Sequence, residues 1–174
     1  MSIDSLRYNR AARILHWLIA LMVIANLLSG FLHDQLAPYF RLMPLHKSTG
    51  LTILILSFIR LGWRAAWRRP PYPASVGRTE IAVANAVQAT FYGLMIAMPV
   101  TGWIIASAGK YPLSWFGLAD ITKFQVDRNA AIYHTSHGMH EILGWLFLAL
   151  IVLHVAAGLR HHLLLRDNVL RRMV

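Results

Sequence analysis

The chain has 174 residues, of which 57% are hydrophobic and only 14% are charged. Such a composition would expose too much apolar surface on a soluble domain, so it favours a membrane protein and leaves room for one modest domain. The absence of cysteine excludes disulfides, thiolate nucleophiles and iron–sulfur clusters. A formal net charge of +10 suits nucleic acid, anionic lipid or small anions equally well.

Four apolar segments are each close to the ~20 residues that a transmembrane helix needs. They cover residues 14–32, 45–63, 81–108 and 140–165. The first is longer than the apolar part of a signal peptide and lacks a clear cleavage site, so we expect it to be retained as a helix. The sequence therefore predicts an all-α integral membrane protein, a four-helix bundle that forms a single domain over residues 1–174.

The basic residues are distributed unevenly among the segments that join these spans. Twelve of the 17 Lys and Arg lie at the N-terminus, between the second and third spans, or at the C-terminal end. The positive-inside rule then predicts that both termini are cytoplasmic. Because these arginines flank apolar spans instead of alternating with aromatic residues on a soluble surface, we expect contact with lipid and no nucleic-acid partner.

Four of the nine histidines lie in or at the ends of three predicted spans. His140 and His154 are fourteen residues apart, which places them on nearly the same helix face about 21 Å apart. The predicted topology puts His16 at the depth of His154, near the cytoplasm, and His46 at the depth of His140, near the outer surface. Each of these two pairs could ligate one haem iron.

A small residue follows each of these histidines by four positions, one turn further along the same face. The four are Ala20, Gly50, Gly144 and Gly158. A flat macrocycle needs room of this kind beside its ligand. Small residues also allow close helix packing in membranes, and this alternative stays open.

Several short motifs together resemble the bacterial cytochrome b561 family over nearly the whole chain. They are Arg13-Ile14-Leu15-His16-Trp17, Leu45-His46-Lys47-Ser48-Thr49-Gly50, His140-Glu141 followed by Gly144, and Leu153-His154 followed by His161-His162 and Asp167-Asn168. The fourteen-residue spacing with a downstream His-His is the most specific feature. The resemblance implies a multi-pass protein of the bacterial inner membrane, with two haems b between its helices. It also implies axial ligation of these haems by the pairs His16/His154 and His46/His140.

The resemblance further implies an oxidoreductase that takes electrons from superoxide at the periplasmic side and reduces ubiquinone. The outer loops carry Lys47, Lys110, Lys123 and Arg128, which could steer a small anion toward the outer haem. Lys47 is the main candidate because it directly follows His46. These cations could also be ordinary loop residues or partners of haem propionates.

His161 is the candidate residue for the quinone. It lies seven residues after His154, on the same helix face and near the cytoplasmic interface. There it could donate a hydrogen bond to a quinone carbonyl or carry a proton to it. The alternative is a histidine whose polar tip lies at the interface without a role in the reaction.

Two other functions remain open from the sequence. A cytochrome b subunit that anchors a periplasmic dehydrogenase or hydrogenase would use similar haem-bearing helices and pass electrons from that redox partner to quinone. A metal-binding membrane protein could use His134, His137 and His140, which are spaced by three residues at the start of the fourth span. The spans lack buried acidic residues to neutralise a moving cation, which disfavours the second alternative.

Overall fold

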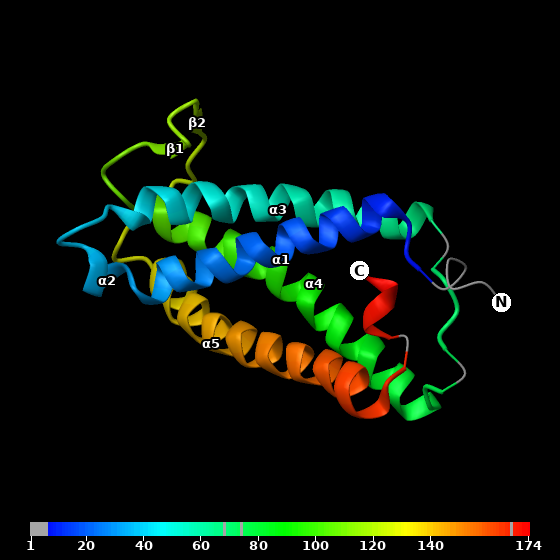
Figure 1. Cartoon of the computed structure of the whole chain (residues 1–174). Coiled ribbons are helices and arrows are strands. Elements are labelled where there is room, and N and C mark those ends of the chain that lie inside the picture. The colour runs from blue at the N-terminus through cyan, green and yellow to red at the C-terminus, as the bar shows by residue number, and fades with distance from the viewer. Residues whose placement is uncertain (1–6, 68, 74, 168) are drawn as a thin grey trace.

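The structure is a computed structural model that describes residues 7–67, 69–73, 75–167 and 169–174. Within this part of the chain, four helices are long and apolar enough to cross a membrane. They are α1 (Arg10–Phe31), α3 (Leu42–Ala66), α4 (Arg78–Ser107) and α5 (Ala131–Arg160). These helices run alongside one another, and both chain ends lie at the same end of the bundle (Figure 1). The predicted all-α membrane bundle is therefore confirmed.

The helices extend beyond the apolar segments at most of their ends. The largest difference is at α5, which begins at Ala131, whereas the predicted span begins at His140. Hydropathy detects only the apolar part of a helix, while backbone hydrogen bonding continues into polar turns such as the one that contains His134 and His137. Asn168, which belongs to one of the motifs, lies outside the described residues.

Helix ends are fixed by local hydrogen bonds. The Asn9 side chain accepts a 2.9 Å hydrogen bond from the Ala12 amide at the start of α1. At the other end of the chain, α5 continues into a π-helical turn, His161–Leu165 (η2), which ends where Arg166 takes a left-handed conformation with φ 51°. A final 3₁₀ turn, Leu170–Arg172 (η3), follows.

The connections at the far end of the bundle contain the short helix α2 (His33–Leu36) and a β-hairpin. Strands β1 (Leu113–Trp115) and β2 (Ala119–Ile121) pair antiparallel within the connection between α4 and α5. Hydrogen bonds that involve side chains of both elements attach the hairpin to α3. Ser48 Oγ lies 3.1 Å from the Ser114 carbonyl, and the Trp115 indole donates to Thr52 Oγ1 at 3.0 Å.

The best-packed part of the bundle is its centre, where all four long helices contribute apolar side chains. The cluster consists of Ile19, Val23, Leu27, Ile53, Leu94, Met95 and Phe147. Many large apolar side chains face outward instead, among them Leu21, Ile142 and Leu153, which are each about two-thirds exposed. Apolar residues on both the inside and the outside are expected of a bundle surrounded by lipid.

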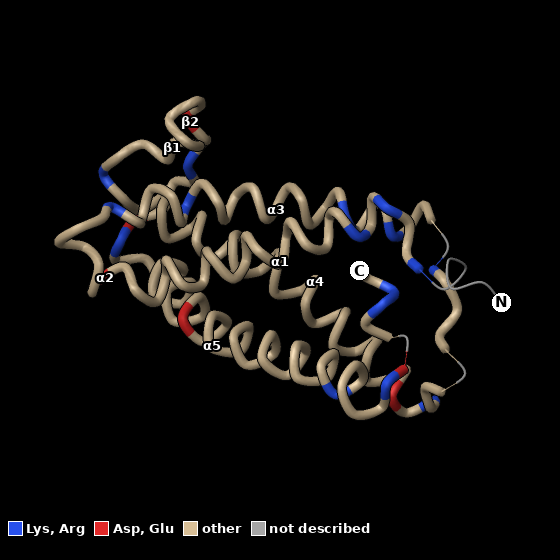
Figure 2. Tube along the Cα trace, viewed as in Figure 1, with Lys and Arg blue, Asp and Glu red and all other residues tan. Residues whose placement is uncertain are grey.

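Charged residues gather at the two ends of the bundle and leave its middle nearly uncharged (Figure 2). A thickness without charge is what the hydrocarbon core of a membrane requires. The end with the two termini carries many arginines, and the end with the hairpin carries the lysines of the outer loops.

Candidate functional site

Two pairs of histidine rings face each other between the helices of the bundle, with His16, His46 and His140 partly buried and His154 exposed. The rings of His16 on α1 and His154 on α5 have centroids 6.3 Å apart and planes inclined at 79°. The rings of His46 on α3 and His140 on α5 have centroids 6.2 Å apart and planes inclined at 76°. Helix α5 thus supplies one ring to each pair, and its two histidines lie about 21 Å apart along the helix axis.

The separation of the rings fits a metal ion held between them. A metal–nitrogen bond of about 2.0 Å and a further ~1.1 Å from nitrogen to ring centre put two opposed imidazole centroids about 6.2 Å apart. Both pairs have this separation. Two axial imidazoles leave the equatorial positions of an iron to a macrocycle, so the residues present fit haem.

We call His46 and His140, at the hairpin end of the bundle, the outer pair, and His16 and His154 the inner pair. The second ring nitrogen of each outer histidine has a polar partner. His46 Nδ1 lies 3.0 Å from the Asn26 carbonyl oxygen and 3.1 Å from Ser29 Oγ. His140 Nδ1 lies 3.0 Å from Thr101 Oγ1. With Nδ1–H donating to these oxygens, Nε2 keeps its lone pair for a metal. These partners were not predicted from the sequence, although polar residues inside apolar spans are a detectable signal.

Two glycines give the outer rings the space that they occupy. A Cβ at Gly30 would lie 2.9 Å from His46 Cε1, and a Cβ at Gly102 would lie 3.1 Å from His140 Cε1. Any larger residue would push the ring away from its present position. Neither glycine was singled out from the sequence, because each lies on a different helix from the histidine that it faces.

The three glycines predicted beside the histidines have ordinary packing in the structure. The nearest atom to a Cβ built there is 3.6 Å away at Gly50, 3.6 Å at Gly144 and 3.8 Å at Gly158. These are van der Waals contacts with side chains of other elements. Their role as space beside a macrocycle stays a prediction.

Aromatic and cationic side chains surround the inner pair. The Phe91 ring meets the His154 ring edge-on with centroids 5.3 Å apart, and Trp17 lies 5.4 Å from His16. Arg60 on α3 is close enough to act electrostatically on both imidazoles. The inner pair therefore lies in a more cationic environment than a purely apolar core would provide.

A small cavity of about 260 Å³ lies at the hairpin end of the bundle. Three cationic side chains line it, namely Lys47, Lys110 and Arg128, and its lining includes no acidic residue. Lys123, the remaining outer candidate, does not line it and instead donates to the carbonyl oxygens of Gly109 and Tyr111. The structure therefore gathers three of the four predicted outer cations.

His161 lies in the π-helical turn and is paired with Asp167. Its Nδ1 is 2.6 Å from Asp167 Oδ2, and the two side chains are only 14% and 10% exposed. Asp167 also accepts a hydrogen bond from the Val169 amide, which fixes the carboxylate. Asp167 belongs to one of the sequence motifs, but its pairing with His161 was not predicted. The left-handed Arg166 turns the chain back in a way that helical spacing does not predict.

The histidines at the start of α5 do not form a metal site. Tyr133 contacts the rings of His134 and His137. Among the described residues, no group of three or more His, Asp or Glu side chains is placed to hold a metal ion. The alternative of a metal-binding site at His134, His137 and His140 therefore has no support in the described part of the structure.

Four apolar helices with paired histidines inside them define the architecture of a membrane cytochrome b. Residues 7–174 match the family described as prokaryotic cytochrome b561, and the chain belongs to this family. It is a redox protein of a bacterial membrane that uses haem b in electron transfer.

Relatives are similar over almost their full length. "Cytochrome b561 homolog 2" of Escherichia coli strain K12 is 30% identical, over 97% of this chain and 91% of that protein. "Probable superoxide oxidase CybB" of Yersinia pestis is 29% identical, over 92% of this chain and 91% of that protein. "Cytochrome b562" of Cereibacter sphaeroides is 25% identical, over 96% and 94% of the two chains.

Proposed function

We propose that this chain is a single-domain, di-haem electron-transfer protein that oxidises superoxide at the periplasmic side of the inner membrane and reduces ubiquinone. His16 and His154 would hold the inner haem, and His46 and His140 the outer one, with both termini in the cytoplasm. The observation that carries the proposal is the presence of two ring pairs with the same separation, about 6.2 Å, within one bundle.

Haem b supplies one-electron chemistry when it is bound. If two histidines held each iron, no site would be left there for oxygen, so the protein's own part would be to bind reactants at its two ends. The hydrogen bonds that the outer imidazoles donate to Thr101, Ser29 and the Asn26 carbonyl orient these rings. The apolar cluster around Phe147 lies between the two pairs and excludes water from the path.

The outer cavity suits superoxide because it is small and lined by cations. A monovalent anion gains from Lys47, Lys110 and Arg128 together, and no carboxylate in the lining opposes it. Lys47 follows His46 directly, so an anion drawn to its ammonium group arrives beside the outer haem site. The name of the Yersinia pestis relative, which describes it as a probable superoxide oxidase, agrees with this donor.

The inner end suits a quinone that takes up protons. His161 and Asp167 form a hydrogen-bonded pair in which the imidazole can donate to a carbonyl oxygen while the carboxylate stabilises its charge. Two superoxide ions each lose one electron and become oxygen. Ubiquinone gains these two electrons and two protons from the cytoplasm and becomes ubiquinol, so electrons and protons balance.

The proposal is tested on the purified full-length protein in detergent. We expect a reduced-minus-oxidised spectrum of b-type haem, about two haems per chain by the pyridine haemochrome assay, and turnover when superoxide and a soluble ubiquinone are supplied together. Two haems without turnover would favour the anchor-subunit alternative, in which a periplasmic redox protein is the electron donor. A protein without haem would contradict the whole assignment.

Substitution of Lys47 tests the outer cavity. Lys47→Gln is expected to slow superoxide oxidation about tenfold at low ionic strength, and the difference should shrink as salt screens the charge. The haem content should not change. Arg41→Gln is the matched control because it also removes a positive charge at the outer end of the bundle, but from an exposed residue outside the cavity lining. Equal losses in both variants would show that only the overall charge matters.

A further inference from the structure

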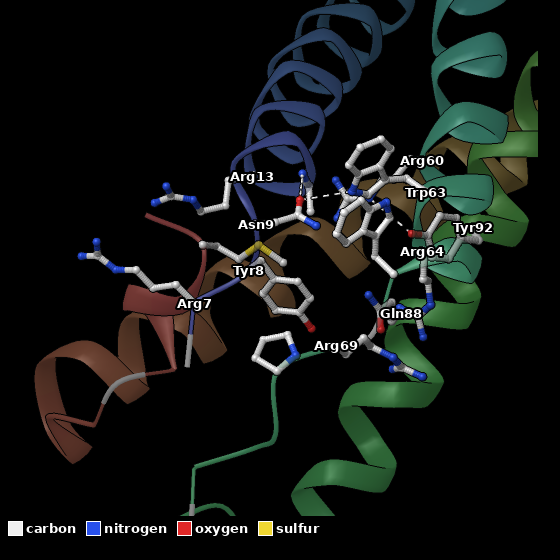
Figure 3. A pocket seen from close by; sticks show the side chains of 14 residues that line it. Arg7, Tyr8, Asn9, Arg13, Arg60, Trp63, Arg64, Arg69, Gln88 and Tyr92 are labelled. Carbon is white, nitrogen blue, oxygen red and sulfur yellow. Dashed lines mark hydrogen bonds between the residues drawn. The ribbon is translucent and has the colours of Figure 1, made fainter. Parts of the chain in front are cut away.

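A second cavity lies at the end of the bundle that carries both termini, and it is about twice as large as the cavity at the hairpin end. It has a volume of about 520 Å³. Its walls are formed by α1, α3 and α4, together with short segments beyond the helix ends, including Tyr8 and Pro70 (Figure 3). Neither the superoxide site nor the His161–Asp167 pair uses this cavity.

The lining is strongly cationic. It contains Arg7, Arg13, Arg60, Arg64 and Arg69 and no acidic residue. Among the described residues, we find no carboxylate in an ion pair with the last four of these arginines. Arg13 Nη1 donates to a Val174 oxygen at 2.6 Å, whereas Arg13 Nε is buried without an acceptor in the described part of the chain. Arg7 and Arg69 are exposed, but the partly buried Arg13, Arg60 and Arg64 are costly beside an apolar bundle unless an anion completes the site.

The arginines nearest the helices are held in defined positions. Arg60 Nε donates to the Tyr92 hydroxyl at 3.3 Å, and the Arg64 guanidinium lies 5.6 Å from the Tyr92 ring centre. Both therefore approach the cavity from α3 with their positions fixed by α4. Among the described residues, Tyr92 is the hydrogen-bond partner of the Arg60 side chain, through Nε. The terminal nitrogens of Arg60 therefore remain for a ligand in the cavity.

The cavity begins about one helical turn from the inner histidine pair, whose rings do not line it. Arg13 on α1 and the N-cap residue Asn9 line the cavity. They precede His16 by three and seven residues, which is about 4.5 Å and 10.5 Å along the helix axis. On α3, the lining residues Arg60, Trp63, Arg64 and Trp67 form one face of the helix. Arg60 is the residue of this face that lies nearest the inner pair, and its positive charge acts electrostatically on both His16 and His154.

We propose that this cavity binds the two propionate carboxylates of the haem held by His16 and His154, with Arg60 as the principal partner. This inference rests on the proposed function, because it requires a haem at the inner pair. Arginine matches a carboxylate with two parallel N–H donors, and that match is strongest where water is excluded. The arginines would then fix the orientation of the inner macrocycle and favour its reduced state, because reduction adds one negative charge near them.

The test combines a potential with a direct signal from the carboxylates. The full-length protein is produced with haem that carries ¹³C in its propionate groups, as wild type, Arg60→Gln, Arg60→Lys and Arg78→Gln. Arg78 is the matched control because it is an exposed arginine at the same end of the bundle and does not line the cavity. Redox titration gives the two midpoint potentials, and redox-difference infrared spectra give the ¹³C-sensitive carboxylate bands.

In Arg60→Gln we expect one haem to become about tenfold harder to reduce, a downward shift of about 59 mV, with the other haem unchanged. Its ¹³C-sensitive bands should move, while Arg60→Lys shows a smaller change and Arg78→Gln shows none. Arg60→Lys keeps the test decisive if the glutamine variant fails to fold.

Two results would overturn the inference while leaving the di-haem proposal intact. One is a variant with both haems whose ¹³C bands and potentials match those of wild type. The other is loss of copurifying phospholipid phosphate from Arg60→Gln without any change in those bands, which would assign the cavity to a lipid headgroup. A wild-type protein without haem would overturn both proposals together.

Discussion

Replacement of His140 by Ala is expected to remove one of the two proposed haems and to leave the other in place. The His140 ring is the partner of His46 at 6.2 Å, and an iron with one remaining protein ligand is held far more weakly. Pyridine haemochrome analysis should fall from about two haems to about one per chain. The remaining haem should keep the spectrum of a six-coordinate, low-spin centre because His16 and His154 are untouched.

Combination of variants tests the pairing itself. His46→Ala with His140→Ala should lose no more haem than either change alone, whereas His16→Ala with His140→Ala should lose both haems. His137→Ala is the matched control, since this exposed histidine lies one turn before His140 on the same helix. Full haem content in His140→Ala would remove this residue from the ligand set.

Much of the architecture follows from simple periodicities in the sequence. Apolar segments of membrane length predict the four helices, and the fourteen-residue interval from His140 to His154 predicts two rings on one face of α5. An up-and-down bundle then fixes which histidine of another helix lies at each depth. This is why the pairs His16/His154 and His46/His140 can be proposed from the sequence.

The surroundings of the rings could not be predicted in the same way. Thr101 and Gly102 meet His140 from α4, and Gly30 meets His46 from α1. Such contacts depend on the rotation of each helix about its own axis, and one sequence contains little information on that rotation. The same limit applies to Asp167, whose approach to His161 depends on the single left-handed residue Arg166.

The two ring pairs differ in the groups that surround them, and this difference has a functional meaning. The outer imidazoles are oriented by neutral oxygens of Thr101, Ser29 and Asn26, while the inner pair lies near the Arg60 guanidinium. A cation near a redox centre favours the reduced state. Lys47 acts on His46 in the same way, so the outer pair also has a cation nearby. In the proposed di-haem protein, a redox titration therefore decides whether electrons move downhill from the outer haem to the inner one.

Replacement of His161 by Ala is expected to slow quinone reduction about a hundredfold without loss of haem, because it removes the proposed donor to the quinone carbonyl. Haem reduction by dithionite should be unchanged, since His161 belongs to neither ring pair. His162→Ala is the matched control, because His162 is the next residue along the chain and its side chain is exposed. The measurement is the rate at which ubiquinone reoxidises the reduced haems in a stopped-flow experiment.

Asp167 separates a chemical role of His161 from a structural one. Asp167→Asn keeps the size of the side chain that lies 2.6 Å from His161 Nδ1 but removes the negative charge that stabilises a protonated imidazole. We expect a loss of about tenfold in quinone reduction, smaller than that in His161→Ala. Added imidazole should restore part of the rate in His161→Ala and none in Asp167→Asn. If quinone reduction stays at the wild-type rate in His161→Ala, the quinone is protonated elsewhere and the pair serves only to hold the C-terminal turn against α5.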